Sequence, residues 1–453
     1  MEIVRKIGRG LWPLLAAGTV CLTAPTQAKT ARIPTVPLAA PQDLIEYSMR
    51  QGDNLFTLAQ RALQRPDSYR AVQRINRISN PRQIPTGTVL KIPLNLLRAD
   101  PLSARIIALR GTVTLRQNDG LAPARIGAAL LPGVAIETGT DGFVTIELPN
   151  GSRTSMPTRT RLRIVRLHRI ALTGSIDYDL AVDGGKVETT ASPLGTDANN
   201  RFRIRTPRAL SAVRGTVFRV AFADEAATSL TEVLEGAVAA SSATSGEQAS
   251  LTPGLGAVIA ASGNVRTETL LAAPDLRDPG RVQVDPQVRL NLATLTGASA
   301  YRLQIAEDAG FTRILDDRSG DAAEFVIDDI PNGSLFVRVS AVAASGLEGV
   351  PQTYAMRRIL AGVTASAQAD ADSMRFAWGG SGEGRRTYSF QLGAADGKGA
   401  WLVDEAGLET SGIRLRRLGP GVYRWRVGVR QESGGEVVEN WLPFEKLTVA
   451  APE

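Results

Sequence analysis

The N-terminal fold of this chain is decided by the stretch YSMRQGDNLFTLA at residues 47–59. Residues 47–49 begin as a strand, Gly52-Asp53 turns the chain sharply, and a helix follows. Asn54 can cap this helix, because a short polar side chain accepts hydrogen bonds from the first unpaired amides. One helical face collects the apolar residues of the stretch, which are Leu55, Leu58 and Ala59. The pattern predicts a strand, a tight turn and an amphipathic helix.

A second turn-rich segment, NPRQIPTG at residues 80–87, is followed by the strand VLKIP at residues 89–93. Together the two segments resemble the LysM module, whose βααβ fold binds glycans containing N-acetylglucosamine, such as peptidoglycan. The module is expected over residues 44–97. The chain departs from the usual pattern at Asn54, where Thr is usual, and at Thr86, where Pro or Gly is commoner. Since Asn caps a helix as well as Thr does, the fold is still expected.

The resemblance implies a shallow groove between the turn before the helix and the region around residues 78–81. Backbone N–H and C=O groups there can pair with the acetamido group of a sugar, and apolar side chains can cover its methyl group. The expected glycan-binding residues are Gly52, Asp53, Asn54, Leu55, Ile78, Asn80 and Pro81. The alternative is a degenerate groove, in which Gly52 and Pro81 serve the turns alone. A single shallow site is expected to bind weakly.

The first 28 residues have the features of a secretory signal peptide, with a basic start, an apolar run over residues 11–24 and small residues before the expected cleavage after Ala28. The single cysteine, Cys21, lies inside this segment, so disulfides and thiolate metal sites are not expected in the mature chain. Residues 29–43 are rich in Pro and Ala and predict an extended linker. No later run of apolar residues is long enough for a transmembrane helix. We therefore expect secretion to the periplasm or cell envelope.

The formal net charge of +7 is unevenly distributed. Residues 44–93 carry eight basic and three acidic residues, and residues 101–222 carry seventeen and nine, whereas residues 223–453 carry twenty-one and thirty. The front half is therefore expected to be drawn to anionic surfaces. Behind a signal peptide, cell-wall glycans or lipid headgroups are the expected anions rather than nucleic acid. A basic surface with no specific partner is the alternative.

Residues 102–272 alternate short β segments with turns such as Asn150-Gly151, which predicts an all-β domain, either a sandwich or a β-solenoid. Six ordered motifs resemble the FecR domain of envelope proteins: Gly111-Thr112-Val113, Leu131-Pro132-Gly133, residues 138–144, Asn150-Gly151-Ser152, residues 214–218 and residues 234–238. The resemblance implies a non-enzymatic domain that contacts other proteins. The best-known members transmit signals across the envelope and carry a membrane-spanning helix with a cytoplasmic segment, which this sequence lacks.

The C-terminal part contains an internal repeat. The strand YRLQI at residues 301–305 recurs as YSFQL at residues 388–392, and the strand around residues 333–339 recurs about ninety residues later. Repeating units of this length with alternating strands predict two β-sandwiches, over residues 279–360 and 361–450. They look like fibronectin type III modules.

Catalytic chemistry finds little support in the sequence. The only histidine, His168, lies in a run whose alternation predicts a strand with a basic solvent face. Arg161, Arg163 and Arg166 on this run could dock an acidic partner, because guanidinium groups pair well with carboxylate and phosphate. Two acidic pairs occur, Asp316-Asp317 and Asp328-Asp329. Adjacent residues of a strand point to opposite faces, so the two carboxylates of each pair are not suited to act together as general acid and base. We expect no catalytic residues, no metal site and no cofactor.

These observations predict a mainly β, multidomain, non-enzymatic envelope protein that binds peptidoglycan and presents its β domains to an unidentified envelope protein. The main alternative is a signalling or regulatory protein in which the FecR-like domain senses or transmits a signal and the LysM-like module only tethers it. A cell-wall hydrolase is disfavoured because no catalytic constellation is present.

Overall fold

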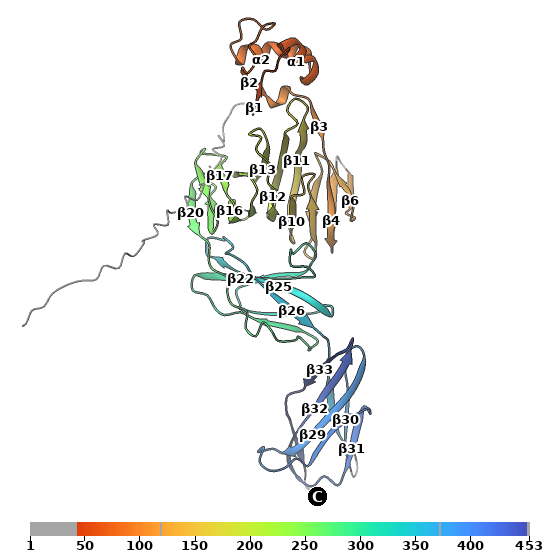
Figure 1. Cartoon of the computed structure of the whole chain (residues 1–453). Coiled ribbons are helices and arrows are strands. Elements are labelled where there is room, and N and C mark those ends of the chain that lie inside the picture. Colours follow the sequence, from red (N-terminus) through yellow and green to blue (C-terminus); the bar gives the residue numbers. More distant parts are fainter. Residues whose placement is uncertain (1–42, 118–119, 371–372, 451–453) are drawn as a thin grey trace, which may run out of the picture.

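The computed structural model describes residues 43–117, 120–370 and 373–450 (Figure 1). The predicted signal peptide, and the predicted linker apart from Asp43, lie outside these residues. Strand makes up 55% of the described residues and helix 5%, in several separate sheets. The predicted mainly β, multidomain fold is therefore confirmed.

Residues 44–97 form a small helix–strand unit at one end of the molecule (Figure 1). Its elements are β1 (Leu44–Ser48), α1 (Leu55–Ala62), the 3-10 helix η1 (Pro66–Ser68), α2 (Tyr69–Ile75), β2 (Val89–Pro93) and the 3-10 helix η2 (Leu94–Leu96). β1 and β2 pair antiparallel, with Tyr47 opposite Leu90. The helical face predicted to be apolar lies in the core, since Leu55, Leu58 and Ala59 are fully buried. This unit has the predicted βααβ order.

A closed β-barrel follows. Its strands are β3 (Ala99–Pro101), β4 (Ala104–Arg110), β5 (Val113–Gln117), β6 (Gly120–Pro123), β7 (Ala129–Leu130), β8 (Ala135–Thr138), β9 (Phe143–Glu147), β10 (Arg153–Met156), β11 (Arg161–Ile170), β12 (Ile176–Thr190), β13 (Arg201–Arg205), β14 (Ala209–Val213), β15 (Val217–Ala223), β16 (Thr228–Glu235), β17 (Val238–Ser242), β18 (Gln248–Leu251), β19 (Leu255–Ile259) and β20 (Val265–Thr269). One apolar core, drawn from strands along the whole barrel, fills it. β3 pairs with β11, so the barrel begins three residues before the expected boundary at residue 102.

The long strand β12 joins the two parts of the barrel. Its first half pairs with β11 and β13, and its second half pairs with β10 and β15. The change of partners falls at Gly184-Gly185, where Gly185 has φ +78°. A Cβ on Gly185 would lie 2.6 Å from the carbonyl oxygen of Arg159 and 2.6 Å from Thr160 Oγ1. Only glycine fits this bend, because it tolerates positive φ and leaves room for the neighbouring strand.

Two β-sandwiches complete the chain. The first contains β21 (Val288–Asn291), β22 (Ala298–Ala306), β23 (Ile314–Gly320), β24 (Glu324–Ile327), β25 (Gly333–Ala343) and β26 (Gln352–Arg358). The second contains β27 (Thr364–Asp370), β28 (Ser373–Gly379), β29 (Arg385–Ala394), β30 (Val403–Leu408), β31 (Gly412–Arg416), β32 (Gly421–Ser433), β33 (Glu436–Trp441) and β34 (Glu445–Val449).

The strand order of the first sandwich recurs in the second, which adds β27 and β34. In the first, β23-β22-β25-β26 faces the pair β21-β24; in the second, β30-β29-β32-β33 with β34 faces β27-β28-β31. Each encloses its own apolar core. The repeat seen in the sequence therefore corresponds to a repeated fold, and the four domains follow one another in chain order along the molecule (Figure 1).

Candidate functional site

The two loops of the expected glycan site meet through a backbone hydrogen bond. The amide of Leu55, at the start of α1, donates to the carbonyl oxygen of Pro81 at 3.0 Å. On the far side of α2, the Ile78 amide donates to the Gln73 carbonyl, and the Gln73 side chain donates back to the Ile78 carbonyl, each at 3.0 Å. The loop before α1 and the loop after α2 are thereby held side by side.

Asn54 fixes the first of these loops as a helix cap. Its Oδ1 accepts hydrogen bonds from the amides of Phe56 and Thr57, each at 3.0 Å. In return, the Thr57 hydroxyl accepts from the amide of Asn54 at 3.2 Å. This reciprocal capping box satisfies the amides at the helix start, as the sequence predicted for Asn54. Its side-chain oxygen is thus occupied within the protein.

Asp53 is also tied into the module. Its carboxylate accepts from the Tyr47 hydroxyl at 2.6 Å and the Arg50 amide at 3.0 Å, and it pairs with Arg61 at 3.3 Å. Slight burial raises the pKa of Asp53, but the hydrogen bonds from Tyr47 and Arg50 and the charge of Arg61 outweigh this effect and lower it. The carboxylate is therefore negative at neutral pH and orders the turn.

The remaining predicted residues differ in exposure. Gly52 is exposed, has φ +85° and has open space around its Cα, and Asn80 is exposed while its Oδ1 accepts from the Arg82 amide at 3.0 Å. Ile78 and Pro81 are half-buried. The side chain of Leu55 is completely buried in the core. Leu55 can therefore contact a ligand only through its backbone atoms.

Two aromatic residues outside these loops, Phe56 in α1 and Tyr69 at the start of α2, were not singled out from the sequence. The rings of Phe56 and Tyr69 lie with their centroids 4.6 Å apart, and the Arg82 guanidinium lies 5.9 Å from the Phe56 ring centroid. Both rings are half-buried and so keep exposed area. The sequence could have indicated the exposure of Phe56, because this residue directly follows the buried Leu55. Consecutive residues of a helix point in different directions, so Phe56 faces away from the core.

The arginines of β11 have carboxylate partners within the chain. Arg161 pairs with Asp224 at 2.6 Å, and Arg163 pairs with Asp183 at 3.0 Å. Arg166 contacts Asp177 at 2.8 Å and Asp179 at 2.7 Å. Docking of an acidic partner by these three residues stays a prediction, and such a partner would compete with these internal carboxylates.

The only histidine lies at the junction between the helix–strand unit and the barrel. His168 lines a cavity of about 510 Å³ together with Asp43, Gln64, Arg166 and Asp177. Burial lowers the pKa of His168, and the nearby charge of Asp177 offsets this only in part. The imidazole is therefore neutral at pH 7, and its neighbours are arginine–aspartate pairs of the domain junction.

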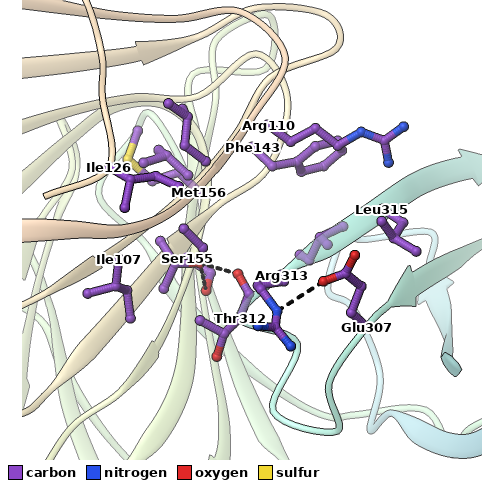
Figure 2. Close-up of a pocket in the computed structure, with 15 residues that line it drawn as sticks. Ile107, Arg110, Ile126, Phe143, Ser155, Met156, Glu307, Thr312, Arg313 and Leu315 are labelled. Atoms are coloured by element: carbon purple, nitrogen blue, oxygen red, sulfur yellow. Dashed lines mark hydrogen bonds and ion pairs between the residues drawn. The ribbon is translucent and has the colours of Figure 1, made fainter. Parts of the chain in front are cut away.

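A second cavity lies between the barrel and the first sandwich (Figure 2). It has a volume of about 210 Å³ and is lined mostly by apolar side chains, including Ile126, Phe143 and Met156. Thr145 Oγ1 donates to the carbonyl of Thr312 at 3.0 Å and joins its two walls. Ile126 is 65% exposed at the barrel wall of this cavity. The cavity can receive a small apolar group.

Within residues 43–117, 120–370 and 373–450, no group of three or more His, Cys, Asp or Glu side chains is placed to hold a metal ion. In the same part of the chain, no helix has the length and apolar character needed to cross a membrane.

Comparison with protein families finds two domains. Residues 47–93 match the LysM domain, and residues 134–239 match the family described as FecR protein. Both predicted domain types are therefore confirmed, although neither match reaches half of the chain. A search of curated proteins finds no match.

Solved structures give distant likenesses of fold. A candidate anti-sigma factor from Parabacteroides distasonis is 17% identical with a TM-score of 0.25, covering 30% of this chain and 59% of its own. A segment of two fibronectin type III domains from chicken tenascin is 15% identical with a TM-score of 0.18, covering 38% and 99%. Fibronectin(III)-like modules of Clostridium thermocellum CbhA are 10% identical with a TM-score of 0.18, covering 39% and 94%. The chain thus spans about three fifths of the first of these proteins.

LysM and FecR domains are typical of envelope proteins, and the families found here are non-catalytic. The LysM match indicates glycan binding, and the FecR match indicates protein partners.

Proposed function

We propose that this chain is a non-enzymatic protein of the periplasm or cell envelope that binds peptidoglycan, or another N-acetylglucosamine glycan, through the two loops joined at Leu55 and Pro81. The signal peptide predicted over residues 1–28 directs its export. The barrel and the sandwiches then present surfaces to envelope protein partners.

The observation that carries this proposal is the hydrogen bond from the Leu55 amide to the Pro81 carbonyl. It holds the loop at Gly52 and the loop at Asn80 at a fixed spacing before any ligand arrives. A preformed site loses less conformational freedom on binding, which matters for a ligand held by few contacts. Around this pair of loops, Phe56 and Tyr69 offer exposed aromatic area for the apolar face of a sugar.

The LysM domain is attached firmly to the barrel. The Asn199 side chain accepts from the Glu46 amide and donates to the Glu46 carbonyl, each at 2.9 Å. Arg203 pairs with Asp43 at 3.0 Å, and the barrel residues Ile170 and Leu172 join the LysM core. A glycan bound at the loops would therefore set the orientation of the barrel with respect to the wall.

The test is a pull-down of residues 29–453 on purified insoluble peptidoglycan at low and high salt. A Gly52→Trp, Asn80→Ala double variant places a large side chain in the open space at Gly52 and removes the Asn80 side chain. We expect salt-resistant binding by the native protein and its loss in this variant and in a deletion of residues 44–97. Gly254→Trp is the matched control, because Gly254 has φ +82° and equally open surroundings in the barrel. Binding that survives the double variant but disappears in high salt would contradict a specific site.

The second candidate is a signalling or regulatory protein in which the LysM domain only tethers the FecR-like barrel. It is favoured by the apolar cavity between the barrel and the first sandwich, with the exposed Ile126 at its wall. A photo-reactive amino acid at position 126 should then give one defined cross-linked product in cells, with or without residues 44–97. The exposed Val437 of the last sandwich is the control position. A product at 126 that requires the LysM domain would favour the scaffold instead.

A further inference from the structure

Two tryptophan side chains of the last sandwich lie flat on the sheet β30-β29-β32-β33, each over a glycine. A Cβ on Gly393 would lie 2.9 Å from the ring of Trp401, and a Cβ on Gly428 would lie 2.5 Å from the ring of Trp441. Gly428 stands directly opposite Trp441 in the sheet. Glycine inside a strand weakens the strand, so its use here marks a place where another group must approach the backbone closely.

Two arginines of β32 lie between these rings. The Arg424 guanidinium lies 4.8 Å from the ring centroid of Trp401 and 4.7 Å from that of Phe444. The Arg426 guanidinium lies 4.4 Å from Trp441 and 4.3 Å from Phe444. The rings of Trp401 and Phe444 are nearly parallel, at 15°, with centroids 5.7 Å apart. We call these five residues the aromatic–arginine platform: Trp401, Arg424, Arg426, Trp441 and Phe444.

The two arginines of the platform have no carboxylate partner among the described residues. Among the described residues, neither Arg424 nor Arg426 forms an ion pair, and Arg424 Nε is buried with no hydrogen-bond partner. Arg426 Nε donates to the neutral amide of Gln391 at 2.8 Å. Arg430, four residues further along the same strand, does approach a carboxylate, at 3.8 Å from Glu439. The two guanidinium groups are therefore held in place by rings. Both side chains are half-buried, so each keeps exposed area that an external anion can reach.

The aromatic part of the platform is accessible. Phe444 is 40% exposed, and the neighbouring Val422 and Leu402 are 41% and 58% exposed. This surface belongs to the last domain, at the end of the molecule opposite the LysM helices (Figure 1).

We propose that the aromatic–arginine platform binds an acidic polysaccharide, a chain of sugars that carry carboxylates. The axial C–H groups of a pyranose form a flat apolar face that stacks on an exposed aromatic ring, here Phe444, which is 40% exposed. A carboxylate on the same sugar accepts the paired N–H groups of a guanidinium, which is the geometry arginine prefers. This site is separate from the LysM loops and does not rest on the function proposed for them.

The charge of the domain favours this ligand over a nucleic acid. Residues 361–450 carry eleven basic and eleven acidic residues, so the domain has no net positive charge. Binding to a polyphosphate backbone depends on many neutralising contacts from a basic surface. Two isolated guanidinium groups beside stacked rings fit carboxylates spaced along a sugar chain.

The shape of the surface favours a sugar over a protein. Protein partners are usually anchored by aromatic or arginine side chains that fill pockets on the other molecule. Here Trp401 and Trp441 lie down on the sheet over Gly393 and Gly428 and cannot project into a pocket. A flat ligand is the better complement.

The experiment titrates residues 29–453 with oligogalacturonate and follows tryptophan fluorescence and heat. Methyl-esterified oligogalacturonate, which keeps the sugar faces and removes the charges, serves as the matched ligand; poly-glutamate and a single-stranded oligonucleotide represent the other polyanions. We expect a change of fluorescence with oligogalacturonate and binding at least about tenfold weaker for the ester, since a charge-assisted hydrogen bond is lost. The Gly52→Trp variant should bind oligogalacturonate as the native chain does, apart from its altered fluorescence baseline.

Arg426→Gln is the test variant and Arg430→Gln the control on the same strand. We expect Arg426→Gln to weaken oligogalacturonate binding by about tenfold or more, and Arg430→Gln to leave it within about twofold. Arg424→Lys keeps the charge but loses the flat guanidinium, and it should bind less tightly than the native chain. Calorimetric unfolding of each variant separates loss of binding from loss of fold.

Three results would overturn the proposal. If the methyl ester bound as tightly as oligogalacturonate, the carboxylates would have no part in binding. Tighter binding of poly-glutamate or the oligonucleotide would assign the surface to another class of polymer. No binding by the native chain, together with a lowered unfolding temperature in Arg424→Lys and Arg426→Gln, would assign the platform to bracing of the sheet alone.

Discussion

At the scale of single residues, the candidate glycan site depends on side chains that face inward. The side-chain oxygens of Asn54 and Asp53 accept hydrogen bonds from groups of the LysM domain itself, namely backbone amides and the Tyr47 hydroxyl. They shape the loops, while Gly52 and Asn80 are the exposed members of the predicted set. This division follows from helix ends, where unpaired amides need acceptors and the nearest polar side chains supply them.

The cap at Asn54 gives a prediction at this scale. Asn54→Ala removes the acceptor for the Phe56 and Thr57 amides and should destabilise the start of α1 by about 1 kcal/mol. Hydrogen exchange should show this as faster exchange of the amides of residues 56–59, by about fivefold. Asn54→Ser, which can still cap, should exchange close to the native rate. Unchanged exchange in Asn54→Ala would show that packing of Leu55 alone holds this helix end.

At the scale of elements, the barrel depends on one strand that belongs to two sets of pairings. β12 changes neighbours at Gly184-Gly185, and the second of these has both a positive φ and a crowded Cβ position. The partners on the two sides of the bend are different strands, β11 and β13 before it and β10 and β15 after it. A strand of this length can therefore close the barrel only if its bend is permitted at this point.

Gly185→Ala should disrupt the barrel. The new methyl group would lie 2.6 Å from Arg159 O and Thr160 Oγ1, and the backbone would keep an unfavourable φ. Gly254→Ala, at φ +82° with nothing within 4 Å, carries only the conformational cost of about 1–2 kcal/mol. Calorimetry should show a much larger drop in the barrel transition, or loss of soluble protein, for Gly185→Ala. Equal losses in both variants would mean that crowding plays no part.

At the scale of the whole molecule, the barrel and the first sandwich are joined by a buried group of charges. Arg219 is completely buried and contacts Glu188 at 2.9 Å and Glu232 at 3.6 Å from the barrel. From the sandwich, Glu348 approaches Arg219 at 3.4 Å and Lys186 at 2.7 Å. Breaking such a group by removing one partner leaves a buried charge unpaired. This junction is therefore a specific contact between the two domains.

This junction should be sensitive to acid. Burial raises the pKa of Glu188, but the charges of Arg338 and Arg219 outweigh burial and lower it to about 2 from an ordinary value of 4.5. Glu348 is shifted in the same direction by Arg219, Arg302 and Lys186, against its burial. A lowered folded-state pKa stabilises the protein above the unfolded value, and this contribution is lost as the pH falls through the folded value.

The barrel–sandwich junction should therefore weaken between about pH 4.5 and pH 2. Calorimetry and small-angle scattering over this range should show an earlier transition and a less defined domain arrangement as the pH falls. Glu188→Gln should be less stable than the native chain at pH 7 and should show a smaller loss of stability over the same range. Glu445→Gln, at an exposed position of the last sandwich, is the control. A pH profile that Glu188→Gln leaves unchanged would contradict this role of Glu188.

The local features of this protein could be predicted from its sequence: the cap at Asn54, the buried face of α1, the mainly β class, the repeat in the two sandwiches and the LysM and FecR domains. Periodicity, turn residues and capping act over a few positions and can be recognised there. Contacts between distant residues could not be predicted in this way: the arginines of β11 contact aspartates, Arg219 contacts Glu348, and Trp401 and Trp441 lie over glycines. These contacts join residues from separate strands or separate domains. The charge or aromatic ring of a residue does not predict which distant residue it will contact, because strand pairing and domain packing bring the two residues together.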